Sequence, residues 1–589
     1  MSDPTAPAND DPDATPLLPD PTSATGEELL IDEHQAMLVE QGTEDTAATG
    51  GEAASEGGPI GSDRRSLLKS SAVVGVGTGL SRLTGLLRVL ALYYALQLTN
   101  LTDAYNLANT APNIIYELLL GGVLSATLIP VFVDARQRDD DDAVDAVVTA
   151  ITVVLVVLSL AALVAAPWII RVYTDEPSLT SVAVPFLRMF SPQILFYGLT
   201  AVGTALLNSR KRFAVPAFAP ILNNLVLITI LLELHHLAGG VPTVDQMLGD
   251  RTLLLLLGFG TTAGIVAMTV VLWPAMRRAG IRLHVRFDWR HPALRTVARL
   301  SGWTFGYVIA NQVALVLVQR LLVGSGQGNL SAYSLAFVFF QLPHGLLAVS
   351  LMTTYMPDLA ALANRLDFDG FRDRFMEGTR LLVLLVVPAA VGLALLAHPL
   401  MNGLLEPLTS SGGSVGADAS TTGDILRMFA IGLPGFSVYL FTLRGFYALK
   451  DTRTPFLVNL LENGANILLA FALVGGLSAT GLGLAYAGAY LIGAIAAVTL
   501  LARKIGGLWS PAAVASVGRT LAAALAMGLA VGGLVAAVGN VTGAAAVALC
   551  LVGVVFGLAV YFGVLVLLRS DDVDGLTRRL RRLRPAATD

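Results

Sequence analysis

The amino-acid sequence predicts an all-α polytopic membrane protein. Hydrophobic residues make up 54% of the 589 residues and charged residues only 14%. The mean hydropathy is +0.68, whereas a soluble globular protein carries about 25% charged residues. Apolar segments of about 20 residues or more, long enough to cross a bilayer, recur along the chain. These three observations together favour a bundle of transmembrane helices.

We expect fourteen transmembrane helices, because fourteen apolar segments alternate with connections of two kinds. Even-numbered connections hold clusters of Lys and Arg, and odd-numbered connections hold almost none. The positive-inside rule then places the even-numbered connections and both termini in the cytoplasm, so we expect a multi-pass protein of the inner (plasma) membrane. The expected spans are 71–98, 104–133, 143–172, 181–208, 214–236, 252–276, 293–322, 329–358, 378–404, 422–448, 455–476, 479–502, 513–537 and 542–568.

The two ends of the chain differ in charge from the apolar body. Residues 1–63 hold fifteen Asp and Glu and no Lys or Arg, and such a segment buries too little apolar surface to fold alone. We therefore expect residues 1–65 to form a disordered acidic cytoplasmic tail, or alternatively a docking site for cell-wall synthesis proteins. Residues 570–589 form a basic tail whose Arg and Leu pattern suits a short helix on anionic lipid.

A weak internal echo predicts a repeat. The sequence ALLNSRKRFAVPAFAPILNN follows span 4, and FYALKDTRTPFLVNLLENGAN follows span 10, with basic residues, proline and asparagine in the same order. An offset of six spans preserves orientation, so the two halves would be six-helix lobes related by a parallel pseudo-two-fold axis. The expected domains are an N-lobe at 66–280, a C-lobe at 281–508, and two additional C-terminal helices at 509–569.

Two arginines inside the first span predict a hydrated cavity. Arg82 lies near the middle of the span, and Arg88 lies about 9 Å further along the helix. A central arginine costs roughly 2.5–3.5 kcal/mol on the mildest insertion scale. Both side chains therefore need water or an anion, which indicates a cationic cavity within the membrane.

A stripe of polar residues on span 2 should face the same cavity. Asn106, Asn109, Asn113 and Glu117 follow the spacing of one helical face. Polar groups in hydrocarbon need partners. The stripe is explained either by contacts with a ligand or by hydrogen bonds that join helices. Glu117 is harder to explain as a structural contact, and an ion pair with an arginine of span 1 is a further hypothesis.

Span 11 carries a second stripe. Asn459, Glu462, Asn463 and Asn466 share one helical face. A carboxylate among amides inside a membrane helix is suited to binding Na⁺ or carrying a proton, which would couple transport to an ion gradient. The alternative is a structural ion pair at Glu462. We expect no other cofactor.

The motifs of several enzyme classes are missing from the sequence. It contains no GxxxxGK[ST] loop, no HExxH and no Cys/His cluster with metal-ligand spacing. Cys550 is the one cysteine, so a disulfide framework is excluded. We therefore expect a transporter rather than an enzyme, with no resident metal and no nucleic-acid partner.

Five segments within residues 68–569 resemble the MurJ/MviN family of lipid II flippases, within the wider multidrug/oligosaccharidyl-lipid/polysaccharide (MOP) exporter superfamily. They are LSRLTGLLR (80–88), TDAYNLANTAPNIIYELLLGG (102–122), LLNSRKRFAVPAFAP (206–220), FFQLPHGLLAVSLMT (339–353) and FYALKDTRTP (446–455). The NIIYELLLGG form is similar to the branch found in high-GC Gram-positive bacteria. The resemblance implies two six-helix lobes around a cationic cavity, and a lipid-tail groove formed by spans 13 and 14.

The resemblance also implies roles for particular residues. The family's helix 1 arginines correspond to Arg82 and Arg88, which would hold a pyrophosphate, and its aspartate after helix 1 corresponds to Asp103. The alternative for Asp103 is an N-cap of its own helix together with Thr102. Asn106, Asn109 and Asn113 would then contact the sugars or peptide of the substrate. The chain departs from the family at Tyr116, Glu117 and Val338, where many members carry arginines; Arg188, Arg320 and Arg444 are candidates to compensate.

The function implied by the resemblance is translocation of lipid II, the undecaprenyl-pyrophosphate-linked peptidoglycan precursor. The lipid would move from the inner to the outer leaflet by alternating access, and we expect lipid II and membrane lipids as partners of a monomeric protein. Two alternatives remain: an exporter of drugs or of another lipid-linked glycan, and a scaffold for cell-wall enzymes that transports nothing.

Overall fold

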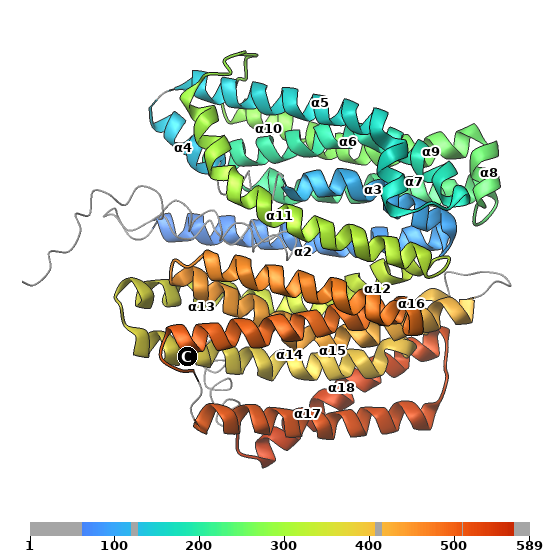
Figure 1. The fold of residues 1–589 in the computed structure, drawn as a ribbon, viewed down its shortest axis with the longest axis vertical. Helices are drawn as coiled ribbons and strands as arrows, with labels where there is room; N and C mark the ends of the chain where they lie inside the picture. The colour runs from blue at the N-terminus through green and yellow to red at the C-terminus, as the bar shows by residue number, and fades with distance from the viewer. Residues whose placement is uncertain (1–61, 119–127, 139, 407–414, 509–510, 571–589) are drawn as a thin grey trace, which may run out of the picture.

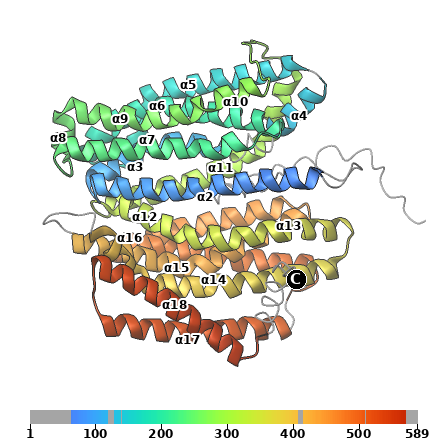
Figure 2. The ribbon, with the colours of Figure 1, turned by 180° about the vertical axis from the view of Figure 1, so that it is seen from behind.

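The structure, a computed structural model, describes residues 62–118, 128–138, 140–406, 415–508 and 511–570, and it is built from helices (Figure 1). The helices run roughly parallel or antiparallel to one another and form two stacked groups, with α2 (Ser62–Leu96) between them in both views (Figures 1 and 2). The expected amphipathic helix at the C-terminus and most of the acidic tail lie outside the described residues.

The first group of helices is the N-terminal half of the molecule. Within it α2 packs on α7, α5 and α3 both pack on α6, and α7 packs on α9. The elements that follow α2 are α3 (Asn100–Leu118), α4 (Ile129–Gln137), α5 (Asp141–Tyr173), α6 (Pro177–Ser209), α7 (Ala214–Ala238), α8 (Val244–Gly249), α9 (Arg251–Val270) and α10 (Leu272–Arg278).

The second group contains the C-terminal half, except for α11 (Pro292–Gly324), and two peripheral helices. Helix α11 runs on the first group's side of α2 in Figures 1 and 2, and it packs on both α5 and α16. A π-helical turn, η5 (His344–Ala348), interrupts the helical span between α12 (Asn329–Pro343) and α13 (Val349–Asn364). Such turns are rare and occur often at functional sites. The other elements are α14 (Phe368–Leu405), α15 (Val415–Ala448), α16 (Arg453–Lys504), α17 (Pro511–Val538) and α18 (Gly543–Leu567).

Element α16 is two antiparallel helices rather than one. Its 52 residues include Ser478 with the non-helical angles φ 52° and ψ −139°, whereas an unbroken helix of this length would extend about 78 Å. The segments before and after Ser478 contact each other in antiparallel register: Gly488 lies against Leu469, and Gly493 lies against Glu462. This hairpin agrees with the two spans expected at 455–476 and 479–502.

The same helix pairs recur in both halves. In the first half the first span packs on the fifth (α2 with α7), the third on the fourth (α5 with α6), and the second on the fourth (α3 with α6). In the second half the corresponding pairs are α11 with the first arm of α16, α14 with α15, and α12 with α15. This recurrence at an offset of six spans supports the predicted parallel repeat. Helices α17 and α18 pack on each other and on α14, outside the repeat.

Ten described helices are long and apolar enough to cross a membrane, when the α16 hairpin is taken as one. Helices α2, α3 and α11 are not among the ten, and each runs beside helices that are (Figure 1). The protein is thus a multi-pass membrane protein with the expected all-α fold. The count of fourteen spans and the domain boundaries stay predictions.

Several helices begin at residues that satisfy the free backbone N–H groups of the first turn. Asp140 accepts a hydrogen bond from the amide of Ala143 at the start of α5, and Asp367 accepts one from the amide of Gly370 at the start of α14. Both caps lie in connections that the charge pattern places in the cytoplasm. The Asp run at 139–142 is therefore partly a helix-capping device.

Candidate functional site

Arg82 and Arg88 lie on α2, the helix between the two halves, and they point to different halves. Six residues correspond to about 120° around an α-helix, so the two side chains leave different faces. The Arg82 guanidinium lies against Gly345 of η5, where an added Cβ would be 2.9 Å from Nη1. Arg88 lies within electrostatic range of the phenols of Tyr105 and Tyr197 in the N-terminal half. The two cations therefore connect the two lobes.

The place where Arg82 meets the second half carries further cationic groups. Arg444 on α15 is only 8% exposed and, like Arg82, lies within electrostatic range of the imidazole of His344. The Nδ1 atom of His344 lies 2.9 Å from Oγ of Ser437. His344 is thus a buried, hydrogen-bonded residue, as most lone histidines in helices are. Two arginines from different helices therefore lie near one π-helical turn.

Asp103 joins the two halves of the molecule. Its Oδ2 accepts a hydrogen bond from the amide of Gly328 (2.8 Å). Its Oδ1 accepts hydrogen bonds from the amide of Ser331 (2.9 Å) and from the Ser331 hydroxyl (2.5 Å). The carboxylate therefore caps α12, a helix of the other half, where the free N–H groups and the helix dipole favour a negative charge.

The expectation that Asp103 caps its own helix is wrong. Helix α3 begins at Asn100, so Asp103 lies inside its first turn, and the amide of Asp103 donates to the carbonyl of Thr99. The neighbouring Thr102 hydroxyl donates to the carbonyl of Gln97 instead. Asp103 is free to cap α12 because α3 starts at Asn100, four residues before the expected start of its span at residue 104. Its expected contact with the substrate stays a prediction.

Further hydrogen bonds strengthen this junction, which we call the Asp103 latch and define as Tyr93, Asp103 and Asn106 with Gly328 and Ser331. The Tyr93 hydroxyl donates to the carbonyl of Ser331 (2.7 Å), and Nδ2 of Asn106 donates to the Ser331 hydroxyl (3.1 Å). Gly328 has φ 77°, and a Cβ there would clash with the carbonyl oxygen of Leu98. A glycine is required at this turn.

The rest of the span 2 stripe is divided among different roles. Asn106 joins two helices by a hydrogen bond in the latch, which was the alternative to contact with a ligand. The Oδ1 atom of Asn109 is buried without a hydrogen-bond partner among the described residues, and Asn113 is half-buried. These two amides remain candidates for contact with a ligand. The side chain of Glu117 lies outside the described part of the chain, so its pairing with an arginine stays a prediction.

The span 11 stripe lies on the first arm of α16 and contacts α11. Nδ2 of Asn463 donates to Oδ1 of Asn311 (2.7 Å) and lies 3.2 Å from Oδ1 of Asn459. The Oδ1 atom of Asn466 is buried without a partner among the described residues. The amides of Asn311, Asn459 and Asn463 thus cluster where α16 meets α11.

Glu462 faces the interior of the second half. Its side chain is 2% exposed, and it lies within electrostatic range of the phenols of Tyr333 and Tyr486. A buried carboxylate costs free energy unless it is neutral or paired. These contacts do not test a role of Glu462 in ion coupling. The structural alternative, an ion pair of Glu462, does not occur within the described ranges.

Of the three arginines expected to compensate for missing family arginines, only Arg444 lies near Arg82. Arg320 at the end of α11 donates to the carbonyls of Arg171 and Val172 and pairs with Asp175 (2.6 Å), so it fastens α11 to the end of α5. Arg188 is exposed on α6. Val338 is half-buried on α12, whereas the side chain of Tyr116 lies outside the described residues.

Sequence reasoning missed the partners of several of these residues. Nothing in the sequence pattern connects Ser331 with Asp103, because the two residues are 228 positions apart. The GSGQGN connection at 324–329 did contain a signal, since repeated glycines predict a turn with positive φ. The contact between Arg82 and Gly345 could be found only from the packing of α2 against η5.

A family model described as lipid II flippase MurJ matches residues 93–551. A protein of Rhizobium tropici named as a probable lipid II flippase MurJ is 27% identical over 543 residues, which cover 88% of this chain and 98% of that protein. A solved structure titled "Lipid II flippase MurJ, inward closed conformation" superposes with a TM-score of 0.69 at 20% identity, covering 85% of this chain and 99% of that chain.

A more distant structure shares the fold. An inward-facing multidrug resistance MATE family transporter of the MOP superfamily superposes with a TM-score of 0.55 at 12% identity, covering 74% of this chain and 94% of that chain. The family model covers well over half of the chain, so this protein belongs to the MurJ family.

Proposed function

We propose that the chain is a lipid II flippase that moves the undecaprenyl-pyrophosphate-linked peptidoglycan precursor from the inner to the outer leaflet by alternating access. One observation carries the proposal: α2 places Arg82 against the second half and Arg88 among residues of the first half. A diphosphate between them would be bound by both lobes. Membership of the MurJ family supports this substrate.

The residues of the site suit such a headgroup. A guanidinium binds phosphate oxygens with a planar fork of donors, which an ammonium lacks. Arg82 lies 14 residues before the end of α2, about 21 Å from it, so the diphosphate would be held deep inside the membrane. Asn109 and Asn113 would contact the sugars or the peptide. The polyprenyl tail would stay in lipid along α17 and α18.

Alternating access requires the two lobes to separate at one end at a time. The Asp103 latch joins them at the end where α2 meets α3 and where α11 meets α12, which the charge pattern places outside the cytoplasm. Opening toward the outer face therefore requires these hydrogen bonds to break. The bound headgroup would supply differential contacts that favour this step.

We propose that Glu462, with Asn459 and Asn463, couples transport to Na⁺ or H⁺. A buried carboxylate without a described ion pair and a cluster of amides where α16 meets α11 support this role. Flipping measured in vesicles should then depend on the ion gradient, and Glu462→Gln should remove that dependence. Unchanged coupling in Glu462→Gln would contradict the assignment.

The decisive experiment measures lipid II exposed on the outer leaflet in cells depleted of the native flippase and supplied with a variant. Arg82→Ala and Arg88→Ala should fail to restore exposure at normal membrane levels. Arg82→Lys should restore it only in part because the fork is lost. The matched control is Arg138→Ala, which removes an exposed arginine of α4 paired with Asp134. Full restoration by Arg82→Ala and Arg88→Ala would overturn the site.

The similarity to the fold of a MATE transporter supports a second candidate function, which is export of drugs or of another lipid-linked glycan. The lipid-linked precursor that accumulates inside depleted cells distinguishes the two transport functions. A scaffolding role predicts instead that deletion of residues 1–63 abolishes function and that Arg82→Ala does not. We propose a monomer in the plasma membrane with both termini cytoplasmic, an orientation that labelling of terminal cysteines in intact cells tests directly.

A further inference from the structure

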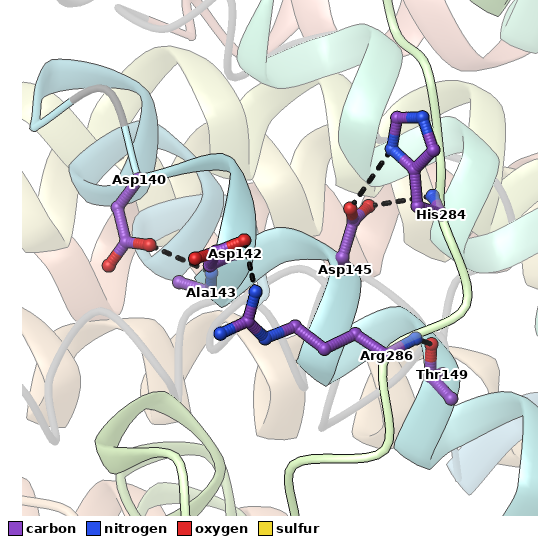
Figure 3. Close-up of polar contacts among 7 residues, drawn as sticks. All are labelled: Asp140, Asp142, Ala143, Asp145, Thr149, His284 and Arg286. Carbon is purple, nitrogen blue, oxygen red and sulfur yellow. Dashed lines mark hydrogen bonds and ion pairs between the residues drawn. The ribbon is translucent and has the colours of Figure 1, made fainter.

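The connection between the two halves, residues 280–291, is an extended segment fixed to the first turns of α5; we call it the inter-lobe strap. The amide of His284 donates to Oδ1 of Asp145 (3.0 Å), and its Nδ1 lies 3.3 Å from Oδ2 of the same carboxylate. The amide of Arg286 donates to the hydroxyl of Thr149 (3.0 Å). Figure 3 shows both contacts along one side of α5. The strap is therefore held in a defined position.

The strap is buried where it begins, and it is apolar and uncovered further along. Ile281 is buried, and Leu283 packs against the same hydrophobic cluster. The next three alternate residues face outward, with Val285 at 78%, Phe287 at 69% and Trp289 at 56% exposure. An uncovered row of large apolar side chains on a fixed backbone marks an interaction surface.

Exposed arginines flank this row, next to Asp288 of the strap and the acidic first turns of α5. Arg282 and Arg290 are exposed on the strap, and Arg278 is exposed at the end of the adjacent α10. Trp273, also on α10, is half exposed with the Arg277 guanidinium 5.2 Å from its ring centre. Aromatic rings together with arginines are typical of the boundary between hydrocarbon and lipid headgroups on the cytoplasmic side.

The contacts with α5 place the strap at that boundary. Helix α5 has 33 residues, about 50 Å, whereas the hydrocarbon core needs about 20 residues. If the hydrocarbon core ends at Arg171 in the last turn of α5, the 20 residues of α5 that cross it begin near Thr152. The strap follows α5 inward, from Asp145 at His284 to Thr149 at Arg286, so Phe287 and Trp289 come next to the start of the hydrocarbon.

The backbone and the side chain of Arg286 indicate which way along α5 the membrane interior lies. Its backbone bonds to Thr149, but its guanidinium reaches back to pair with Asp142, about 10 Å nearer the end of α5 (Figure 3). This is the snorkelling geometry of an arginine whose backbone lies deeper than its charge. The neighbouring side chains of Val285 and Phe287 are wholly apolar, so they have no charged group that would reach back toward water.

We propose that the inter-lobe strap is a binding surface for anionic phospholipids of the cytoplasmic leaflet. Phe287 and Trp289 insert at the headgroup boundary, while Arg282 and Arg290 bind the lipid phosphates. Apolar insertion and anionic attraction add in such surfaces, with about a fivefold gain in affinity for each arginine near the membrane. The surface is separate from Arg82 and Arg88 on α2.

The test uses the full-length chain reconstituted in vesicles, with Cys550→Ser and a nitroxide on a single new cysteine. Phe287→Cys and Trp289→Cys report the strap, and Asp369→Cys is the control on another predicted cytoplasmic connection, where the side chain is 89% exposed. Collision with oxygen reports contact with lipid, and collision with a water-soluble nickel chelate reports contact with water. The vesicles contain phosphatidylcholine alone or phosphatidylcholine with phosphatidylglycerol.

We expect nickel collision several-fold lower at 287 and 289 than at 369, and lower again when phosphatidylglycerol is present. Arg282→Gln with Arg290→Gln should remove the effect of phosphatidylglycerol. Nickel collision at 287 equal to that at 369 in both vesicles would overturn the proposal, because the strap would then lie in water. Equal depth in both lipids, unchanged by the arginine substitutions, would overturn the anionic part. Both substitutions are at exposed positions, so folding is preserved.

Discussion

Replacing Asp103 by alanine should open the outer end of the protein. The substitution removes the acceptor of three hydrogen bonds, two from backbone amides of α12 and one from Ser331. A hydrogen bond to a charged group contributes about 1.5–3 kcal/mol. The three share one carboxylate and are not additive, so we expect a loss of about 3 kcal/mol, or about a hundredfold in the equilibrium between joined and separated outer ends.

The assay is a distance measurement between nitroxides at the outer end of each half. Asp245→Cys on α8 and Ser420→Cys on α15 are exposed positions for the labels, in a Cys550→Ser background. Wild-type protein should give one short distance, and Asp103→Ala should shift the distribution to longer distances. Asp103→Asn keeps an acceptor oxygen and should shift it less.

A matched control separates the latch from general charge loss. Asp175→Asn removes another carboxylate that joins the two halves at this end, through Arg320, but its side chain is 76% exposed. Exposed ion pairs contribute about 0–1 kcal/mol, so this variant should keep the wild-type distances. If Asp103→Ala gives the same distribution as Asp175→Asn, the latch does not set the conformational equilibrium and the reasoning is refuted.

Two other predictions concern Arg82 and the connection between α15 and α16. Gly345→Ala places a methyl group against the Arg82 guanidinium and should impair flipping as Arg82→Ala does. The control Gly464→Ala adds a methyl group in open space and should not impair flipping. Equal lipid II exposure for the two variants would contradict the contact between Gly345 and Arg82. Burial raises the pKa of Asp451. Hydrogen bonds from Lys504 and then from Thr454 lower this pKa by more than burial raises it, so it lies below the ordinary carboxyl value. The resulting stability is present at neutral pH and is lost as the pH falls through that lowered pKa. Asp451→Asn should therefore reduce the melting temperature in detergent near pH 7 and lose this effect in acid, and a difference that stays constant with pH would contradict the assignment.

Hydropathy, charge and internal similarity were sufficient to predict the architecture. A membrane requires each span to satisfy its own backbone hydrogen bonds, so span length and apolar composition are read directly from the sequence. The break at Ser478 separates the two spans that hydropathy had placed on either side of it. The repeat was predictable because corresponding helices keep similar sequence at their ends.

The candidate site was predictable only in part. Arg82 and Arg88 could be identified because charge inside an apolar span is costly wherever the span lies. Their separation onto two lobes was also implicit in a spacing of six residues, which places them on different helical faces. Their neighbours could not be inferred, since Gly345 and Tyr197 come from other helices.

The sequence by itself determined the class of the protein, its helices and the cations within its first span, because local composition sets the cost of placing each residue in a bilayer. Only the tertiary structure decided that Asp103 caps a helix 228 positions away, that Asn106 joins helices, and that the strap is fixed to α5. A polar side chain in a membrane must find a partner, but which partner it finds depends on how distant helices pack.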